Sequence, residues 1–375
     1  MLTPEDSLRL NVLLKQDLHA LRIDEGKMLV HALTARGEAR VALKPNGSDE
    51  AYLRKVRELI SSQVLGVPHG YPAYLKRWTR MGHARSESLA GLLKLGEPEA
   101  LAAVVHASGL TDELAGRAWW ILQSSDHARA MLRREAVVNG RMGPVLAEFL
   151  VEFLAYEADH SRMVESVRLV LQPGLIDDAV RQDLWTKGHR RTAYRVGFLK
   201  TQPDHLPETP PPHPRLAPLH PQLSQAAAAR NPFARQLHRV LDAPGQVFLD
   251  TVRHALVKSS EQGVVVHLFE ALESYFEPVR PHASGHRRMD LILEDAGRLH
   301  QCIRDPEQQR QFRELMAALP PEDRPLLESL LVFGCIGEPL LAPILGNTDA
   351  VGSALRSALE PVTRGLFPHL DRLQP

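Results

Sequence analysis

Two histidine-containing groups in this chain have residue types that could bind a metal. Glu157 and His160 match the Glu-x-x-His spacing of di-iron helix bundles, but such a site needs the motif twice and two further glutamates. One copy is present, so a capped helix end is the plainer interpretation. His282, His286, His300 and Cys302 have the residue types of a zinc site, yet such spacing arises easily among eighteen histidines. We expect no metal and no cofactor.

The two cysteines, Cys302 and Cys335, stand too far apart for a Cys-x-x-Cys pair. Two cysteines in a chain of this length make a disulfide framework improbable and favour a reducing compartment. Cys335 lies in an apolar segment, where a buried inert thiol is the default expectation. The alternative is that Cys302 or Cys335 handles sulfur, as a persulfide carrier or redox thiol. That chemistry needs a neighbouring cation or helix N-terminus, and the sequence indicates neither.

No catalytic signature interrupts the chain. It has no glycine-rich phosphate loop of the P-loop or dinucleotide kind and no nucleophile elbow. We therefore expect a protein that is not an enzyme. An enzyme whose site assembles from residues far apart in the sequence stays open as an alternative.

Two basic clusters are candidate binding sites for RNA or for an acidic protein. The first interleaves aromatic and basic side chains, which suits stacking on nucleic acid: Tyr74, Lys76, Arg77, Trp78 and Arg80. The second is the densest run of positive charge and could hold phosphates: Lys187, Arg190, Arg191 and Arg195. The plainer alternatives are a helix that buries Tyr74 and Trp78, and a solvated helix end.

The composition limits what such clusters can do. Lys and Arg together number 45 and equal Asp and Glu, so binding to nucleic acid would need a local basic face. Charged residues interrupt the first apolar stretch, which argues against a signal peptide, and no apolar run approaches the length of a membrane-spanning helix. We expect a cytoplasmic protein.

The elements that position these residues are mostly helices. At residues 1–47 we predict a helix that begins at Thr3–Pro4 and buries a face from Leu10 to Leu21, then a β-hairpin of 28–34 and 39–44 around Gly37. A helix would also tolerate the hairpin's composition. Residues 48–201 hold short capped helices, most densely from Ser86 to Lys200, which suggest a HEAT-like solenoid or an irregular bundle.

The second half is separated by proline. Residues 202–222 carry eight prolines, which disfavour helix and strand alike, so we predict an extended linker. Residues 223–375 again show apolar helical faces and predict a second all-α domain. The expected fold class is mainly α, with stacked short helices and a small N-terminal β-hairpin.

Long blocks of the first half resemble a known family. They read LTPEDSLRLNVLLKQDLHALRID, GYPAYLKRWTRMGHARSESLAGLLKLGEPEALAAVVHA, GLTDELAGRAWWILQ, REAVVNGRMGPVLAEFLVEFL and ESVRLVLQPGLIDDAVRQDLW. Together they resemble the sulfur reduction protein DsrS family of sulfur-oxidising proteobacteria, over most of residues 2 to 201. The resemblance implies a soluble cytoplasmic accessory or regulatory protein of sulfite reductase-dependent sulfur oxidation, perhaps one that acts after transcription. The family brings no established catalytic residues.

These observations leave an order of hypotheses. The first is a non-catalytic module that binds a protein of the sulfur oxidation pathway or its mRNA through the two basic clusters. The second is sulfur handling by Cys302 or Cys335, and the third is an enzyme with a dispersed site.

Overall fold

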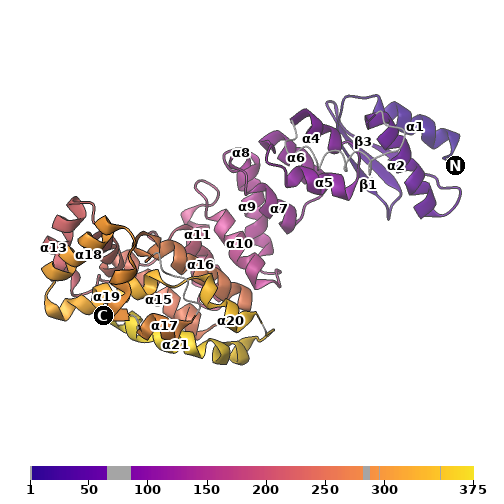
Figure 1. Ribbon diagram of the computed structural model, residues 1–375. Helices are drawn as coiled ribbons and strands as arrows, with labels where there is room; N and C mark the ends of the chain where they lie inside the picture. Colours follow the sequence, from indigo (N-terminus) through magenta and orange to yellow (C-terminus); the bar gives the residue numbers. More distant parts are fainter. Residues whose placement is uncertain (1, 66–85, 282–287, 295, 347) are drawn as a thin grey trace. The chain divides into compact units, whose positions relative to one another are not determined.

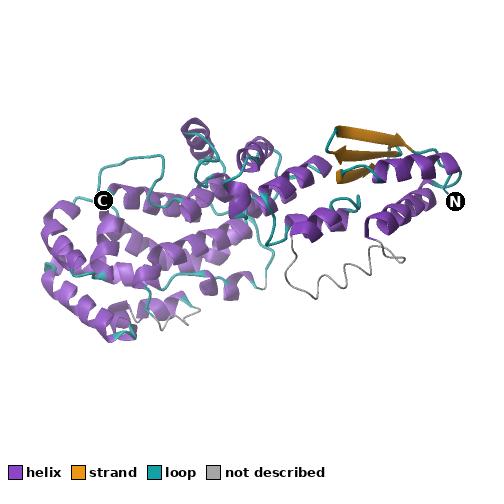
Figure 2. Cartoon of the chain, turned by 90° about the horizontal axis from the view of Figure 1, so that it is seen from above, coloured by secondary structure: helices purple, strands orange, loops and turns teal. Residues whose placement is uncertain are grey.

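The computed structural model describes residues 2–65, 86–281, 288–294, 296–346 and 348–375. It is mainly helical with one small antiparallel sheet near the N-terminus, which confirms the predicted fold class (Figures 1 and 2). The chain forms two compact units. The first holds residues 1–153 and 173–175, and the second holds 154–172 and 176–375.

The first unit opens with helix α1 (Pro4–Leu14), capped by the hydroxyl of Thr3 as predicted. The helix is shorter than the leucine spacing indicated, because Leu18 and Leu21 belong to strand β1 (Leu18–Asp24). A bulge between Leu18 and Ala20 shifts the register of this strand. Leu18 and Leu21 are therefore both buried in the same cluster, although side chains three apart in a regular strand point to opposite faces.

The predicted hairpin is present and is joined by β1 in a three-stranded sheet. Strands β2 (Leu29–Thr34) and β3 (Gly37–Ala42) pair antiparallel, and the sheet order is β1-β2-β3. Gly37 has a φ of +113°, a backbone conformation that favours glycine at this turn. One face of the sheet carries Val30 and Ala32 and packs into a core with α1 and α2 (Asp49–Leu65). The opposite face is the one that matters for function.

The rest of the first unit is a run of short helices after residue 85. Capping by Thr111 and Ser124 fixes the starts of two of them. The first of these two, α6, packs on strand β1. The helices are α4 (Ser86–Leu92), α5 (Pro98–Val105), α6 (Asp112–Ile121), α7 (Ser125–Met131), α8 (Glu135–Val138) and α9 (Met142–Phe153).

The second unit is an irregular helical bundle. Its longer helices are α10 (His160–Val170), α11 (Asp178–Lys187), α12 (Thr192–Thr201), α13 (Leu216–Ala228), α14 (Pro232–Leu241), α15 (Ala243–Val257), α16 (Gln262–Phe276), α18 (Pro306–Ala318), α19 (Arg324–Gly334) and α21 (Gly352–Leu373). The shorter ones are η1 (Glu277–Val279), α17 (Met289–Glu294), η2 (Ala296–Cys302), η3 (Pro321–Asp323), η4 (Glu338–Leu340) and α20 (Ala342–Leu345). Helix α12 packs on both α10 and α16, and α19 contacts α14, α16 and α21. Contacts between helices far apart in sequence distinguish this bundle from a solenoid, in which each repeat touches only its neighbours.

The proline-rich segment is not the tether that the sequence predicted. Asp204 forms an ion pair with Arg239 at 2.6 Å, Leu206 is buried, and the amide of His213 donates to the carbonyl of Leu241. Helix α13 begins at Leu216 and includes Pro221. Proline removes amide donors but does not prevent packing, so the segment belongs to the second unit and the compact units divide after residue 153 instead.

We searched the described helices for membrane-spanning candidates. No single helix among them is both long and apolar enough to cross a membrane. One pair, Pro321–Gly334 with Glu338–Leu345, satisfies the length and composition test together, but it is bent by 78°.

Candidate functional site

A row of three basic side chains crosses the outer face of the N-terminal sheet. Arg22 on β1 lies opposite His31 on β2, and His31 lies opposite Arg40 on β3. Directly paired residues in a sheet share one face, and this is the face turned away from the α1 and α2 core. The three residues come from three strands, so only the register brings them together.

Helix α6 supplies an aromatic side chain beside this row. The guanidinium carbon of Arg22 lies 5.2 Å from the centroid of the Trp120 ring, within the range of a cation–π contact. The indole Nε1 donates to Oε1 of Glu38 on β3 at 2.6 Å. Trp120 is therefore fixed at both ends, by strand β1 and by strand β3.

The carboxylates on this face do not neutralise the arginines. Oδ1 of Asp24 accepts the amide of Lys27, and Glu38 accepts the indole. In the part of the chain that the structure describes, neither Arg22 nor Arg40 forms an ion pair with a carboxylate. Like charges in directly opposed cross-strand positions destabilise a sheet by about 0.2–1 kcal/mol. The row is thus arranged to gain from a bound anion.

The titration of His31 reflects this environment. Its pKa is lowered first by burial and then by the positive charges of Arg22 and Arg40, which outweigh Asp24 and Glu38. The row therefore carries its positive charge on the two arginines near neutral pH, and His31 adds charge as the pH falls.

An open cavity of about 690 Å³ adjoins the row. Its wall includes Arg22, Lys27, Glu97 and Trp120. Gly96, with a φ of +67°, lines it because a Cβ there would stand 2.6 Å from Cδ2 of Leu21. Burial raises the pKa of Glu97, against the opposing charge of Arg57. The cavity offers polar and aromatic surface next to two arginines without carboxylate partners.

The first predicted basic cluster lies outside the described residues. It comprises Tyr74, Lys76, Arg77, Trp78 and Arg80.

The second predicted cluster is divided by the fold. Nζ of Lys187 pairs with Asp183 at 2.6 Å. Nη1 of Arg191 donates to the carbonyl of Leu154 at 3.2 Å. Arg190 is exposed and is the member best placed to meet a partner.

Arg195 was wrongly predicted to be available for binding. Its side chain is only 3% exposed, and the guanidinium carbon lies 4.5 Å from the centroid of Trp185. Nη2 is 3.2 Å from Oε1 of Glu208, which also accepts the Trp185 indole at 2.7 Å. Burial lowers the pKa of Arg195 more than the charges of Glu208 and Asp250 raise it. The residue supports the packing of the second unit.

The two cysteines differ in exposure. Cys335 is buried, and burial together with nearby Cys302 raises the pKa of its thiol to about 12 despite Arg280. Cys302 is half-buried. A thiol with so high a pKa has almost no thiolate at neutral pH.

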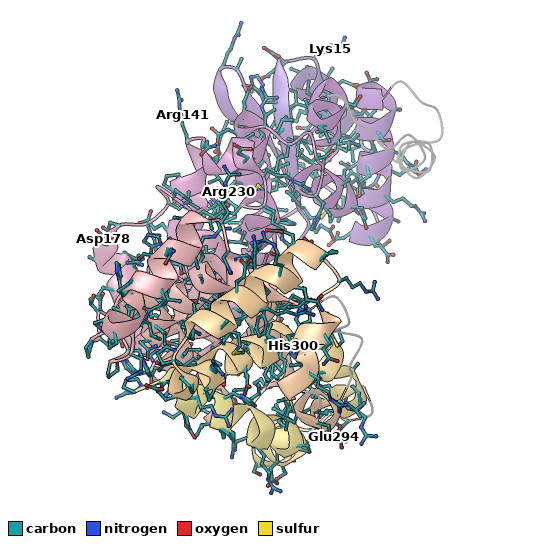
Figure 3. The ribbon with its side chains drawn as sticks, turned by 60° about the vertical axis from the view of Figure 1, so that its left-hand side comes forward. Lys15, Arg141, Asp178, Arg230, Glu294 and His300 are labelled. Carbon is teal, nitrogen blue, oxygen red and sulfur yellow. The ribbon has the colours of Figure 1, made fainter. Side chains whose placement is uncertain are left out.

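The metal interpretations gain no geometric support. Among the described residues no three His, Cys, Asp or Glu side chains are grouped as metal ligands. His300, labelled in Figure 3, stacks on Phe312 with ring centroids 5.7 Å apart, and His282 and His286 lie outside the described residues. Oδ1 of Asp159 caps helix α10, which confirms a capped helix end at the Glu157–His160 pair.

Sequence reasoning missed the basic row because each member is isolated in the chain. A signal was available, since pairing 28–34 with 39–44 around Gly37 sets His31 opposite Arg40. Arg22 could not be added without recognising the first strand. Comparison with protein-family models, with curated proteins and with solved structures found no match to this chain.

Proposed function

We propose that this chain is a non-catalytic accessory protein that binds single-stranded RNA on the outer face of its N-terminal sheet. The observation that carries the proposal is the row of Arg22, His31 and Arg40, whose arginines have no carboxylate partner, beside the fixed ring of Trp120. Antiparallel sheet faces that combine cations with aromatic rings suit single strands, because phosphates pair with the cations while bases stack.

The proposed pathway is sulfite reductase-dependent sulfur oxidation, with the RNA a transcript of that pathway. Its support is the resemblance of residues 2–201 to the DsrS family. A cytoplasmic place and an accessory, post-transcriptional role follow from the same resemblance. The alternative, a sulfur carrier at Cys302 or Cys335, has weaker support because the Cys335 thiol is buried with a pKa raised to about 12.

The proposal is tested by titrating the full chain into a fluorescein-labelled single-stranded RNA and following anisotropy. We expect binding that weakens as salt rises from about 50 to about 200 mM, since arginine–phosphate contacts release counterions. Binding that is absent at the lowest salt contradicts the proposal. So does capture of pathway proteins from lysate that survives ribonuclease while the labelled RNA does not bind, because the partner is then a protein.

A further inference from the structure

Three side chains in the second unit have the connectivity of a serine–histidine–acid triad. Oγ of Ser161 lies 2.9 Å from Nε2 of His267. On the other side of the imidazole, Nδ1 of His267 lies 2.8 Å from Oε2 of Glu270. A triad is recognised by this geometry and not by sequence order, and these residues are separated by up to 109 positions, which is 270 minus 161.

The fold holds these groups on two packed helices. Ser161 is the second residue of α10, after the Asp159 cap, while His267 and Glu270 are one turn apart on α16, which packs on α10 (Figure 1). Gly263 permits the close approach, because a Cβ at this position would stand 2.9 Å from Cβ of Ser161. Ser161 is half-buried, so it is placed between the packed interior and solvent.

A lysine defines the charge of the acid. Nζ of Lys200 on α12 lies 2.6 Å from Oε2 of Glu270. Burial would raise the pKa of Glu270, but the hydrogen bonds from Lys200 and His267 outweigh it and lower that pKa. The acid is therefore a carboxylate at neutral pH.

The carboxylate also decides which nitrogen of His267 carries the proton. Nζ of Lys200 is 2.9 Å from Nδ1 of His267 as well, so the ammonium has two acceptors within reach. A carboxylate is the stronger acceptor for charged donors, which places both the lysine proton and the Nδ1 proton on Glu270. Nε2 then presents its lone pair to the hydroxyl of Ser161.

We propose that Ser161 is a nucleophile that accepts an acyl group from small activated esters. The Ser161 proton moves to Nε2 of His267 as Oγ bonds to the acyl carbon. The ester C–O bond then breaks, and the leaving alcoholate departs with its electron pair. Glu270 holds the imidazole in position. This reactivity is separate from RNA binding and uses residues of the other compact unit.

The surroundings of Ser161 favour one acylation over repeated turnover. The amides of Ser161 and Arg162 both donate to Oδ1 of Asp159, at 2.8 and 3.1 Å. Those amides are therefore not directed at a developing oxyanion, and loss of one oxyanion-hole donor costs about a hundredfold to a thousandfold in rate. We expect slow acylation that leaves a long-lived acyl-serine.

The test uses p-nitrophenyl acetate with the full chain, and follows nitrophenolate release and peptide mass. We expect release that approaches one equivalent, with the acetyl group on Ser161. Ser161→Ala should abolish it, and His267→Gln should slow it by about a hundredfold. The rate should rise with pH as the imidazole loses its proton, and His267→Gln should flatten that profile. Circular dichroism establishes that each variant is folded.

A matched control exists in the same unit. Oγ of Ser224 lies 3.3 Å from Nε2 of His220, but among the described residues no carboxylate pairs with that ring. Ser224→Ala should leave acetylation unchanged. Acetylation of Lys200 or His267 that persists in Ser161→Ala, or no acetylation of the native chain, overturns the proposal.

Discussion

The guanidinium of Arg22 lies 5.2 Å over the ring of Trp120 while the indole nitrogen donates to Glu38. This arrangement removes Glu38 from competition for the neighbouring arginines and holds an aromatic ring against a basic sheet face. The same contact brings α6 to the sheet, so the site depends on elements about 100 residues apart, Arg22 and Trp120 being separated by 98 positions.

The first prediction concerns the stacking surface. Trp120→Ala should weaken binding of single-stranded RNA by about 1–3 kcal/mol, the range for one base–aromatic contact. Tyr156→Ala is the control, because Tyr156 is an 81% exposed aromatic of the other unit and should leave affinity unchanged. Anisotropy titrations measure both. Equal affinity of Trp120→Ala and the native chain would remove the ring from the site.

Two neighbouring arginines should separate structure from surface. Arg195→Ala should lower the free energy of unfolding by about 1–3 kcal/mol, because it empties a buried position and leaves Glu208 and Trp185 without their cation. Arg190→Ala should stay within about 0.5 kcal/mol of the native chain, since the residue is exposed. Urea denaturation measures both, and the reverse order would mean that Arg195 is not structural.

A buried histidine should make stability depend on pH. Burial, reinforced by the charge of Arg372, lowers the pKa of His369 from 6.5 to about 4, and Ser329 hydrogen-bonds its Nδ1 at 3.0 Å. The unfolded chain binds the proton more readily, so this contribution is fully present above pH 6.5 and is lost as the pH falls towards 4. Its size is up to about 3 kcal/mol.

Chemical denaturation across that pH window tests the assignment. His369→Gln removes the titrating group but keeps a polar partner for Ser329. The native chain should lose more stability than this variant between pH 6.5 and 4. Parallel pH profiles would show that another group is responsible.

The cysteines should react in a fixed order. At pH about 8 a thiol reagent should modify half-buried Cys302 first, because the fraction of thiolate at Cys335 is suppressed by its raised pKa. Cys335 should react only when the chain unfolds. Peptide mass spectrometry after timed labelling assigns the sites, and early labelling of Cys335 would revive the sulfur-carrier alternative.

Local patterns were sufficient for much of the fold. Thr3 and Pro4 marked the first helix start, and alternating apolar residues around Gly37 marked the hairpin. The strand at Leu18–Asp24 was missed because its bulge places leucines at a spacing that a helix also produces. The proline-rich segment was misassigned because composition reports the loss of regular structure but not whether the chain packs.

The candidate sites were harder to predict because they depend on tertiary contacts. Arg22, His31 and Arg40 become neighbours only through strand register. Ser161 and His267 meet only because α10 packs on α16. Conversely, Arg195 lies in a dense basic run yet is buried, because its position on α12 faces Trp185.

The most direct test of RNA binding at the sheet compares two double variants by anisotropy over a salt series. Arg22→Ser with Arg40→Ser removes the cations of the row. Arg9→Ser with Arg54→Ser removes the same charge from α1 and α2, the helices that pack on the opposite side of the sheet. The first pair should weaken binding and reduce the slope of log affinity against log salt by about 1.4, or about 0.7 per lost phosphate contact, while the second pair leaves the slope unchanged. Equal slopes in the two double variants would contradict the assignment of the sheet face as the RNA site.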